Sequence, residues 1–212
     1  MKESNRIQVE EGHYDPSAYD ELHRWKSYWY QIQAIGRSQP ARLLEIGSGS
    51  GVISWYARER MGVEVVTFDF DNALSPDIVG DVRDLTQYFE CDSFDCVCAF
   101  QVLEHIPFED FERALQAMAS ISSRSVLISL PHWGYPIELR MQLVRRAWTF
   151  AMARKVSPPK RWSFDGEHHW EIGVEGCSLQ TVRNVVNGPL EIKREYFCPD
   201  YSYHYFFECT VR

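Results

Sequence analysis

The chain has 212 residues, of which 45% are hydrophobic and 14% aromatic, so a single domain with a packed core is expected and a disordered protein is excluded. The formal net charge of −8 argues against broad nucleic-acid binding, which depends on neutralising phosphates. The first six residues (Met-Lys-Glu-Ser-Asn-Arg) do not resemble a signal peptide, and no apolar stretch reaches membrane-spanning length. We therefore expect a cytoplasmic protein.

Residues 15–36 are predicted to form a helix. It opens with Asp-Pro-Ser, a sequence typical of a helix start, and Gly36 is placed to end it. The stripe of apolar residues indicates either core packing or a lid whose polar flank, including His23 and Tyr28, covers a site. The residues that recur at helical spacing are Leu22, Trp25, Trp29, Ile32 and Ile35.

Residues 41–51 read Ala-Arg-Leu-Leu-Glu-Ile-Gly-Ser-Gly-Ser-Gly, a short apolar strand followed by a glycine-rich turn. Glycines let a ligand approach the backbone closely, and the helix predicted over residues 52–60 leaves its first N–H groups unpaired. The dinucleotide fingerprint G-x-G-x-x-G would need a glycine where this chain has Val52. The turn therefore predicts a nucleotide-type site and disfavours a nicotinamide dehydrogenase.

Four further strands are predicted at residues 63–69, 77–82, 94–100 and 125–130, alternating with helices. Such a chain forms a parallel sheet with helices on both faces, and it binds ligands at the carboxyl ends of its strands. Several acids and histidines fall at or near those ends: Glu45, Asp69, Asp81, Glu104, His105 and His132.

The remaining third of the chain begins with a basic segment. Residues 135–155 are predicted to be helical, and residues 139–161 hold seven of the 22 Lys and Arg residues and no acid. This segment is either an ordinary helix whose arginines pair with acids, or a lid that recruits an anionic acceptor or membrane surface. A loop with His168 and His169 follows, then a helix capped by Ser178 and two strands, residues 190–197 and 201–211, in an antiparallel hairpin.

The pattern Glu45-x-Gly47-x-Gly49-x-Gly51 resembles motif I of the class I S-adenosylmethionine-dependent methyltransferases, and Leu-Glu-His-Ile-Pro at residues 103–107 looks like the family's fourth motif. The similarity spans residues 41–130. It implies a Rossmann-like α/β fold with a seven-stranded, mostly parallel sheet in the order 3-2-1-4-5-7-6, the last strand antiparallel and helices on both faces. It also implies S-adenosylmethionine as the cofactor and methyl transfer as the activity.

The resemblance also assigns roles to residues. Asp69 would hold the ribose hydroxyls, Asp81 the adenine amino group, and Glu45 would orient the glycine turn and the methionine amine. The full set of predicted cofactor-binding residues is Glu45, Gly47, Ser48, Gly49, Gly51, Asp69, Asp81, Val82 and Gln101.

The predicted catalytic residues are His105 and His132, because histidine suits general-base chemistry at neutral pH. His105 is the better placed of the two. His168 and His169 are further candidates, or they belong to a plain surface loop. No metal is expected, since the six cysteines include no C-x-x-C pair.

We expect a single methyltransferase domain over residues 1–212. Its parts would be an N-terminal lid (1–36), a cofactor-binding core (37–132), a basic substrate-side insertion (133–175) and a C-terminal helix and hairpin (176–212). The acceptor would be a small molecule or a glycan- or lipid-linked one, with O-methylation favoured over N- or C-methylation. No nucleic-acid partner is expected. A non-catalytic cofactor-binding scaffold or partner subunit, and less favourably a nucleic-acid methyltransferase, remain as alternatives.

Overall fold

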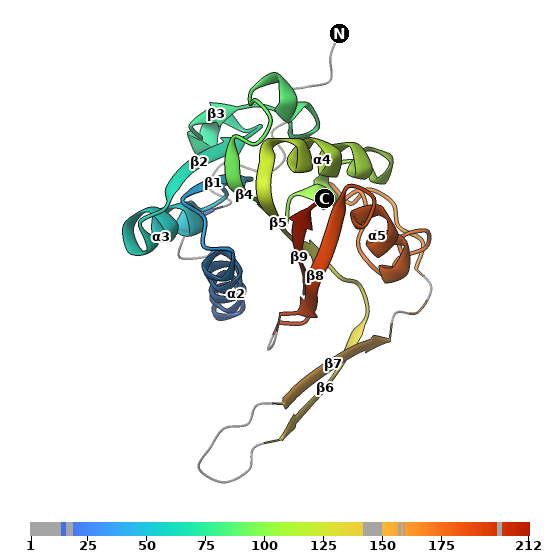
Figure 1. The fold of residues 1–212 in the computed structure, drawn as a ribbon. Coiled ribbons are helices and arrows are strands. Elements are labelled where there is room, and N and C mark those ends of the chain that lie inside the picture. Colours follow the sequence, from blue (N-terminus) through green and yellow to red (C-terminus); the bar gives the residue numbers. More distant parts are fainter. Residues whose placement is uncertain (1–13, 16–18, 142–149, 157, 159, 199–200) are drawn as a thin grey trace.

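The central feature of the computed structural model is a seven-stranded sheet in the order β3-β2-β1-β4-β5-β9-β8 (Figure 1). The structure describes residues 14–15, 19–141, 150–156, 158, 160–198 and 201–212. The first five strands pair in parallel, and β9 runs antiparallel to both β5 and β8. Because β8 and β9 are the sixth and seventh strands of this sheet along the chain, the predicted order is confirmed. The strands are β1 (Arg42–Ile46), β2 (Glu64–Asp69), β3 (Ile78–Val79), β4 (Phe94–Phe100), β5 (Ser122–Pro131), β8 (Leu190–Phe197) and β9 (His204–Val211).

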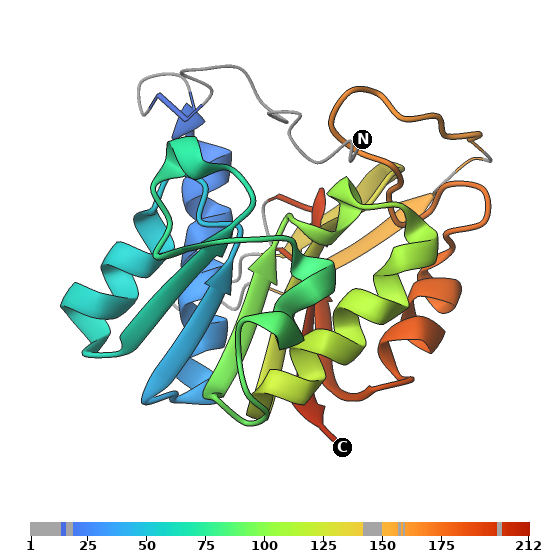
Figure 2. The ribbon, with the colours of Figure 1, turned by 90° about the horizontal axis from the view of Figure 1, so that it is seen from above.

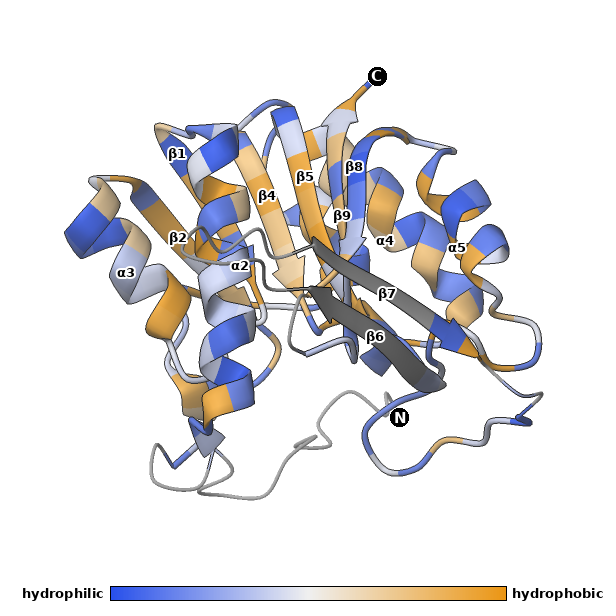
Figure 3. Ribbon diagram, turned by 90° about the horizontal axis from the view of Figure 1, so that it is seen from below, coloured by the Kyte–Doolittle hydropathy of each residue, from blue (hydrophilic) through white to orange (hydrophobic). Residues whose placement is uncertain are grey.

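Helices cover both faces of this sheet (Figure 2). One face packs against α2 (Leu22–Ser38) and α3 (Val52–Met61), and the other against α4 (Phe108–Ile121) and α5 (Leu179–Val186). Neighbouring strand residues serve opposite faces: Leu43 and Cys96 belong to the α2–α3 side, and Leu44 and Val97 to the α4–α5 side. Figure 3 shows that apolar residues dominate β4 and the middle of β5, as expected for central parallel strands covered on both faces.

The helix predicted over residues 15–36 differs from α2 at both ends. Glu21 is extended and α2 begins at Leu22. Gly36 lies inside the helix, which continues to Ser38 and ends where Gln39 adopts a left-handed conformation. A glycine costs a helix only about 1 kcal/mol, whereas Pro40 cannot continue it, and the residue before a proline is driven out of the helical region. In the described part of the chain no helix is both long and apolar enough to cross a membrane.

The basic helix predicted over residues 135–155 is wrong. The structure has two antiparallel strands there, β6 (Tyr135–Met141) and β7 (Phe150–Val156), which pair from Tyr135 opposite Val156 to Met141 opposite Phe150. Residues 135–141 read Tyr-Pro-Ile-Glu-Leu-Arg-Met, and this alternation of apolar with other residues has the period of a strand. The pair extends away from the main sheet (Figure 1). Residues 142–149, and with them Arg145 and Arg146, lie outside the described residues.

Candidate functional site

The glycine turn follows β1 and leads directly into α3. Gly47, Gly49 and Gly51 have φ angles of 76°, 47° and 73°, a left-handed conformation that other residues adopt only with strain. A Cβ added to Gly47 would lie 2.3 Å from the Cγ2 of Val102, and one added to Gly49 would lie 3.3 Å from the ring of Tyr14. Neighbouring side chains thus approach this backbone closely. Gly47 and Gly49 are required both for the left-handed backbone and for the lack of space for a Cβ.

Asp69 joins the end of β2 to the glycine turn. Its side chain is buried; Oδ2 accepts the N–H of Ser48 at 2.9 Å and Oδ1 accepts the N–H of Asp71 at 3.0 Å. Burial raises the pKa of this carboxyl, although the two backbone hydrogen bonds oppose the shift. Each oxygen keeps a second lone pair, so the arrangement is compatible with the predicted bonds to ribose hydroxyls.

Glu45 lies in β1 just before the turn and is only 4% exposed. Burial raises the pKa of its carboxyl to about 8, while hydrogen bonding with Ser54 at the start of α3 acts in the opposite direction. Among the described residues, neither its Oε2 nor the hydroxyl of Ser48 has a hydrogen-bond partner. Buried polar atoms of this kind are normally satisfied, so the turn fits a bound group that carries hydrogen-bonding atoms. The residues present therefore fit the expected cofactor.

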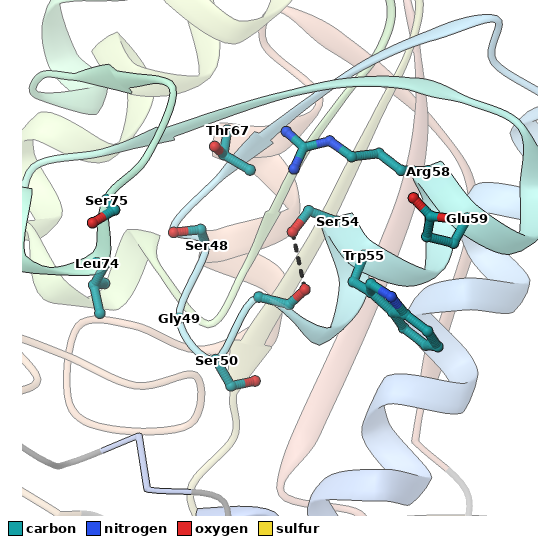
Figure 4. Close-up of a pocket in the computed structure, with 11 residues that line it drawn as sticks. Ser48, Gly49, Ser50, Ser54, Trp55, Arg58, Glu59, Thr67, Leu74 and Ser75 are labelled. Atoms are coloured by element: carbon teal, nitrogen blue, oxygen red, sulfur yellow. Dashed lines mark hydrogen bonds between the residues drawn. The ribbon is translucent and has the colours of Figure 1, made fainter.

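A pocket of about 370 Å³ lies against the glycine turn (Figure 4). Its wall combines the turn with one side of α3 and the short helix η1 (Asn72–Leu74). Of the predicted cofactor residues, those lining it are Ser48, Gly49 and Gly51. The pocket thus lies on the α3 side of the turn. Gly47 lies in the turn without lining the pocket, and the other predicted residues lie at or near the ends of β1 to β4.

The N-terminal helix contacts the turn as well. The Tyr28 hydroxyl, on a side chain only 6% exposed, donates to Asp20 at 3.0 Å and lies 2.9 Å from the Ser50 hydroxyl. Tyr14 covers Gly49 and makes an edge contact with the Tyr19 ring, with centroids 4.8 Å apart. Part of the polar flank of α2 therefore reaches the glycine turn.

Asp81 has a partner that the sequence analysis did not anticipate. It caps the helix η2 (Val82–Gln87) and pairs with Arg83, whose Nε and Nη2 lie 2.9 and 2.5 Å from its oxygens; the Nη1 of Arg83 also donates to Asp110 at 2.9 Å. Burial opposes ionisation of Asp81, but the hydrogen bonds from Arg83 outweigh it and hold the pKa below its usual value. Val82 is buried, and Gln101 has a φ of 59° after β4, where its side chain donates to Ser129 at 3.1 Å.

Glu104, His105 and His168 come together beyond the end of β4. Their ligating atoms all lie within 4.8 Å of one another. His105 is held by the backbone oxygen of Glu167, 2.8 Å from Nδ1, and burial lowers its pKa to about 4. Burial raises the pKa of the Glu104 carboxyl to about 8.

His168 is paired within the same cluster. Its Nδ1 lies 3.1 Å from Glu171, which also accepts from the Tyr203 hydroxyl at 2.5 Å. Burial works against its charged form, but the hydrogen bond to Glu171 and the nearby Glu104 carboxyl outweigh this and raise its pKa. His168 is therefore not a plain surface residue. His169 is exposed and packs on Phe164, at 4.5 Å between centroids.

His132 lies in a different environment from His105. It is 5% exposed, its Nδ1 bonds the backbone oxygen of Trp133 at 2.7 Å, and its ring packs on Phe197 and Tyr205. Burial lowers its pKa to about 4. The described contacts thus unite His105 with His168, and they place His132 among aromatic residues of β8 and β9.

Sequence reasoning missed three residues: Arg83, Glu171 and Tyr203. Glu171 lies only three residues after His168, so their pairing could have been predicted from the local sequence. Tyr203 lies just before β9, and nothing in its own surroundings in the sequence indicates that it meets Glu171.

Comparisons with known proteins agree with this geometry. The sequence matches the family described as "Methyltransferase domain" over residues 19–169, which is most of the chain. No curated protein matches it.

Similar solved structures include a SAM-dependent methyltransferase from Archaeoglobus fulgidus, with a TM-score of 0.63 and 12% identity over 95% of this chain and 100% of that one. The N-methyltransferase NodS from Bradyrhizobium japonicum, in complex with S-adenosylhomocysteine, has a TM-score of 0.56 and 11% identity over 96% and 94%. The 1,6-didemethyltoxoflavin-N1-methyltransferase from Burkholderia thailandensis has 1,6-didemethyltoxoflavin and S-adenosylhomocysteine bound. Its TM-score is 0.52, with 13% identity over 100% of this chain and 93% of that one.

At these identities the structural likeness establishes the fold, and the family match covers most of the same chain. The sheet order, the glycine turn and the acid at the end of β2 agree with both findings. The chain belongs to the class I S-adenosylmethionine-dependent methyltransferases, and S-adenosylmethionine is its cofactor.

Proposed function

We propose that this enzyme methylates a hydroxyl group of a small molecule or of a glycan- or lipid-linked acceptor. The observation that carries the proposal is the histidine cluster at the end of β4, on the sheet edge that also bears the glycine turn. Two of the structural neighbours, NodS and the didemethyltoxoflavin methyltransferase, are named N-methyltransferases, and the second is in complex with its small-molecule substrate. They support a small acceptor. The preference for oxygen rests on the histidines of this chain.

The cofactor supplies a methyl group already activated on a sulfonium, so the protein's work is mainly to position the acceptor and to exclude water. We assign the binding of its methionine and ribose portions to Gly47, Ser48, Gly49 and Gly51, with Asp69 on the ribose hydroxyls. Glu45 lies just before the turn and hydrogen-bonds Ser54 at the start of α3, and its Oε2, which has no partner among the described residues, suits the methionine amine. Asp81, Val82 and Gln101 complete the proposed set, with Asp81 shared between the adenine and Arg83.

His105 is the proposed general base for a hydroxyl acceptor. Its Nδ1 donates to the backbone oxygen of Glu167, so Nε2 is the unprotonated nitrogen of the neutral ring, which also has a hydrogen bond with the backbone of Gln101. The low pKa keeps the imidazole neutral at pH 7, as a base must be, although it also makes it a weak one. His132 is a second candidate, on the strength of its position at the end of β5; its burial among aromatic rings favours a role in shaping the acceptor pocket.

We further propose a division of the domain. Residues 1–36 act as a lid, which the contact between Tyr28 and Ser50 supports. Residues 37–132 hold the cofactor, residues 133–175 face the acceptor, and residues 176–212 complete the sheet. In the acceptor-side part, the Lys160 ammonium lies 3.8 Å from the ring centroid of Trp133 and 4.3 Å from that of Trp162. A positive charge on an aromatic platform suits an anionic acceptor or an anionic membrane surface.

Titration calorimetry with S-adenosylmethionine tests the cofactor assignment. Asp69→Asn keeps the shape of the side chain and removes its charge, and hydrogen bonds to a charged acceptor are worth about 1.5–3 kcal/mol. We expect affinity to fall at least about tenfold. Asp77→Asn is the matched control: Asp77 also accepts a backbone N–H from the β2 strand, at 2.8 Å from Thr67, but it is outside the proposed site. Equal affinity in Asp69→Asn and the parent, with unchanged circular dichroism, would sink the assignment.

The activity itself is tested with the parent enzyme and labelled methyl donor. Metabolite and lipid extracts are offered separately, each before and after acetylation of their hydroxyl groups. Label that appears only in the untreated extract, in a product that mass spectrometry identifies as an O-methyl and not an N-methyl compound, supports an oxygen acceptor. Label that survives acetylation and is stable to ester hydrolysis contradicts it.

A further inference from the structure

Glu104, His105 and His168 bring two imidazoles and one carboxylate to a single point at the acceptor side of the sheet. One ligating atom from each lies within 4.8 Å of the other two. We propose that this cluster binds a divalent transition-metal cation. The sequence analysis expects no metal, because the cysteines show no metal-binding pattern; Glu104 and His105 are adjacent, and His168, 63 residues beyond His105, meets them only in the fold.

The first argument is the state of Glu104. The residue is 0% exposed, and within the described part of the chain neither of its carboxylate oxygens has a hydrogen-bond partner. A buried carboxylate without partners is costly, and proteins avoid it unless a proton or a cation neutralises the charge. A metal ion would satisfy both oxygens at once. A proton would neutralise the charge but would leave the carboxyl without a hydrogen-bond partner, so only a cation accounts for both oxygens.

The second argument is the orientation of the histidines. His105 donates from Nδ1 to the backbone oxygen of Glu167 at 2.8 Å, since a carbonyl oxygen can only accept. The Nδ1 of His168 lies 3.1 Å from a carboxylate oxygen of Glu171. In both neutral rings Nδ1 therefore carries the proton, and Nε2 is the nitrogen left to bind a cation; the ring of His105 also has a hydrogen bond with the backbone of Gln101. A metal-bound histidine almost always gives its other ring N–H to a backbone carbonyl or a carboxylate, and here both do.

A further layer supports Glu171 in turn. The Tyr203 hydroxyl donates to the same Glu171 oxygen at 2.5 Å. This bond fixes the carboxylate that orients His168, so the ligand is held through two successive contacts. Removing an outer partner of this kind typically lowers metal affinity by about 10- to 100-fold.

The two segments that carry the ligands are also fixed to each other. The N–H of His169 donates to the backbone oxygen of Glu104 at 2.8 Å, and the indole of Trp170 donates to that of Ile106 at 3.1 Å. Trp170 is 2% exposed and packs against Phe108 and Phe111, with ring centroids 4.8 and 4.9 Å away. The cluster is thus preorganised and does not depend on a metal to draw distant loops together.

The donor set selects the class of ion. Two imidazoles and one carboxylate suit Zn²⁺ and its neighbours Fe²⁺, Co²⁺ and Ni²⁺ better than Ca²⁺ or Mg²⁺, which prefer oxygen. Three protein ligands leave positions open for water or for an oxygen of the acceptor. A cation there would lower the pKa of a bound hydroxyl and so replace the base role proposed for His105, whose Nε2 would be a ligand.

The test uses the full chain after dialysis against a chelator. Titration calorimetry with Zn²⁺ and the visible absorption of added Co²⁺ report binding without any reference to methyl transfer. We expect one equivalent per chain, with d–d absorption bands of an N/O site. Glu104→Gln and His168→Gln should each reduce affinity by more than about tenfold, and Glu171→Gln by about 10- to 100-fold. His169→Gln is the matched control, because this exposed neighbour lies outside the cluster; it should bind like the parent.

Two results would overturn the proposal: absence of one-equivalent binding in the parent, or parent-like binding in Glu104→Gln with the fold intact by circular dichroism. Loss of binding in His169→Gln equal to that in His168→Gln would also refute it, since it would indicate adventitious surface histidines. Glu104→Gln should fold, because burial raises the pKa of the Glu104 carboxyl to about 8 and a glutamine has the shape of its neutral form. The outcome is independent of the cofactor assignment, which the Asp69 variant tests separately.

Discussion

Gly47 is the residue on which the glycine turn depends most strongly. Gly47→Ala should lower the free energy of unfolding through two effects: the left-handed φ of 76°, and a new Cβ only 2.3 Å from the Cγ2 of Val102. Gly62→Ala isolates the first effect, because Gly62 has a φ of 69° and nothing within 4 Å of an added Cβ. We expect about 1–2 kcal/mol from the conformational strain alone and about 1–3 kcal/mol more at Gly47 from overpacking. Urea denaturation of both variants measures the difference, and equal losses would contradict the close approach.

Residues whose role depends on local chemistry were predictable at this scale. Gly47, Gly49 and Gly51 follow a strand and precede a helix, and the structure gives all three the positive φ that only such a turn requires. The position of Asp69 beside the glycine turn was predictable because a parallel sheet brings the ends of neighbouring strands together; its role toward the ribose remains a proposal. The pairing of Asp81 with Arg83, and of His168 with Glu104, depends on side-chain directions and on a distant loop, which spacing along the chain does not specify.

Among the elements, α2 contributes to the glycine turn through Tyr28. Because Tyr28 donates its single proton to Asp20, the Ser50 hydroxyl must donate to Tyr28. Tyr28→Phe should therefore cost about 0.5–1.5 kcal/mol of unfolding free energy and also weaken cofactor binding. In a double-mutant cycle with Ser50→Ala, measured by urea denaturation, the two losses should not add, since both remove the same bond. Additive losses, to within about 0.3 kcal/mol, would show that α2 does not support the turn.

Most strands of the central sheet were predicted closely because two signals agreed: an apolar run and a turn residue beside it. The strand predicted over residues 77–82 is the exception, since β3 is only Ile78–Val79 and Asp81 caps the helix η2. For α3, the pattern ended at Gly62, which caps the helix in a left-handed conformation. Residues 135–155 lacked that agreement. Apolar residues there fit both a helical stripe and a strand alternation, and the basic charge favours an amphipathic helix. The alternation of apolar with other residues over 135–141 is the signal for β6.

At the scale of the whole molecule, the buried titratable groups predict how stability depends on pH. Burial raises the pKa of the Glu45 and Glu104 carboxyls to about 8, and the pKa of His168 is raised as well. Each such group holds its proton longer in the folded than in the unfolded state, so its stabilising contribution is lost as the pH rises through the folded pKa. His105 and His132 have the opposite sign: their pKa values of about 4 mean that the folded state resists protonation, and stability is lost as the pH falls below about 6.5.

Above the ordinary histidine pKa, His105 and His132 are neutral in both the folded and the unfolded state and no longer change the stability. Only the groups with raised pKa values, Glu45, Glu104 and His168, then contribute to the pH dependence. We therefore expect the unfolding free energy of the chelated, cofactor-free protein to be greatest in mildly acidic solution and to decline as the pH approaches 8. Glu45→Gln removes one of the contributing protons, so it should reduce the slope by up to about 1.4 kcal/mol per pH unit. Glu191→Gln is the control, because its pairing with Lys193 lowers the pKa of Glu191 and places its titration below this range. Urea denaturation across the range decides the matter: a slope that Glu45→Gln leaves unchanged would mean that Glu45 is already ionised in the folded enzyme, with its charge compensated by a neighbour.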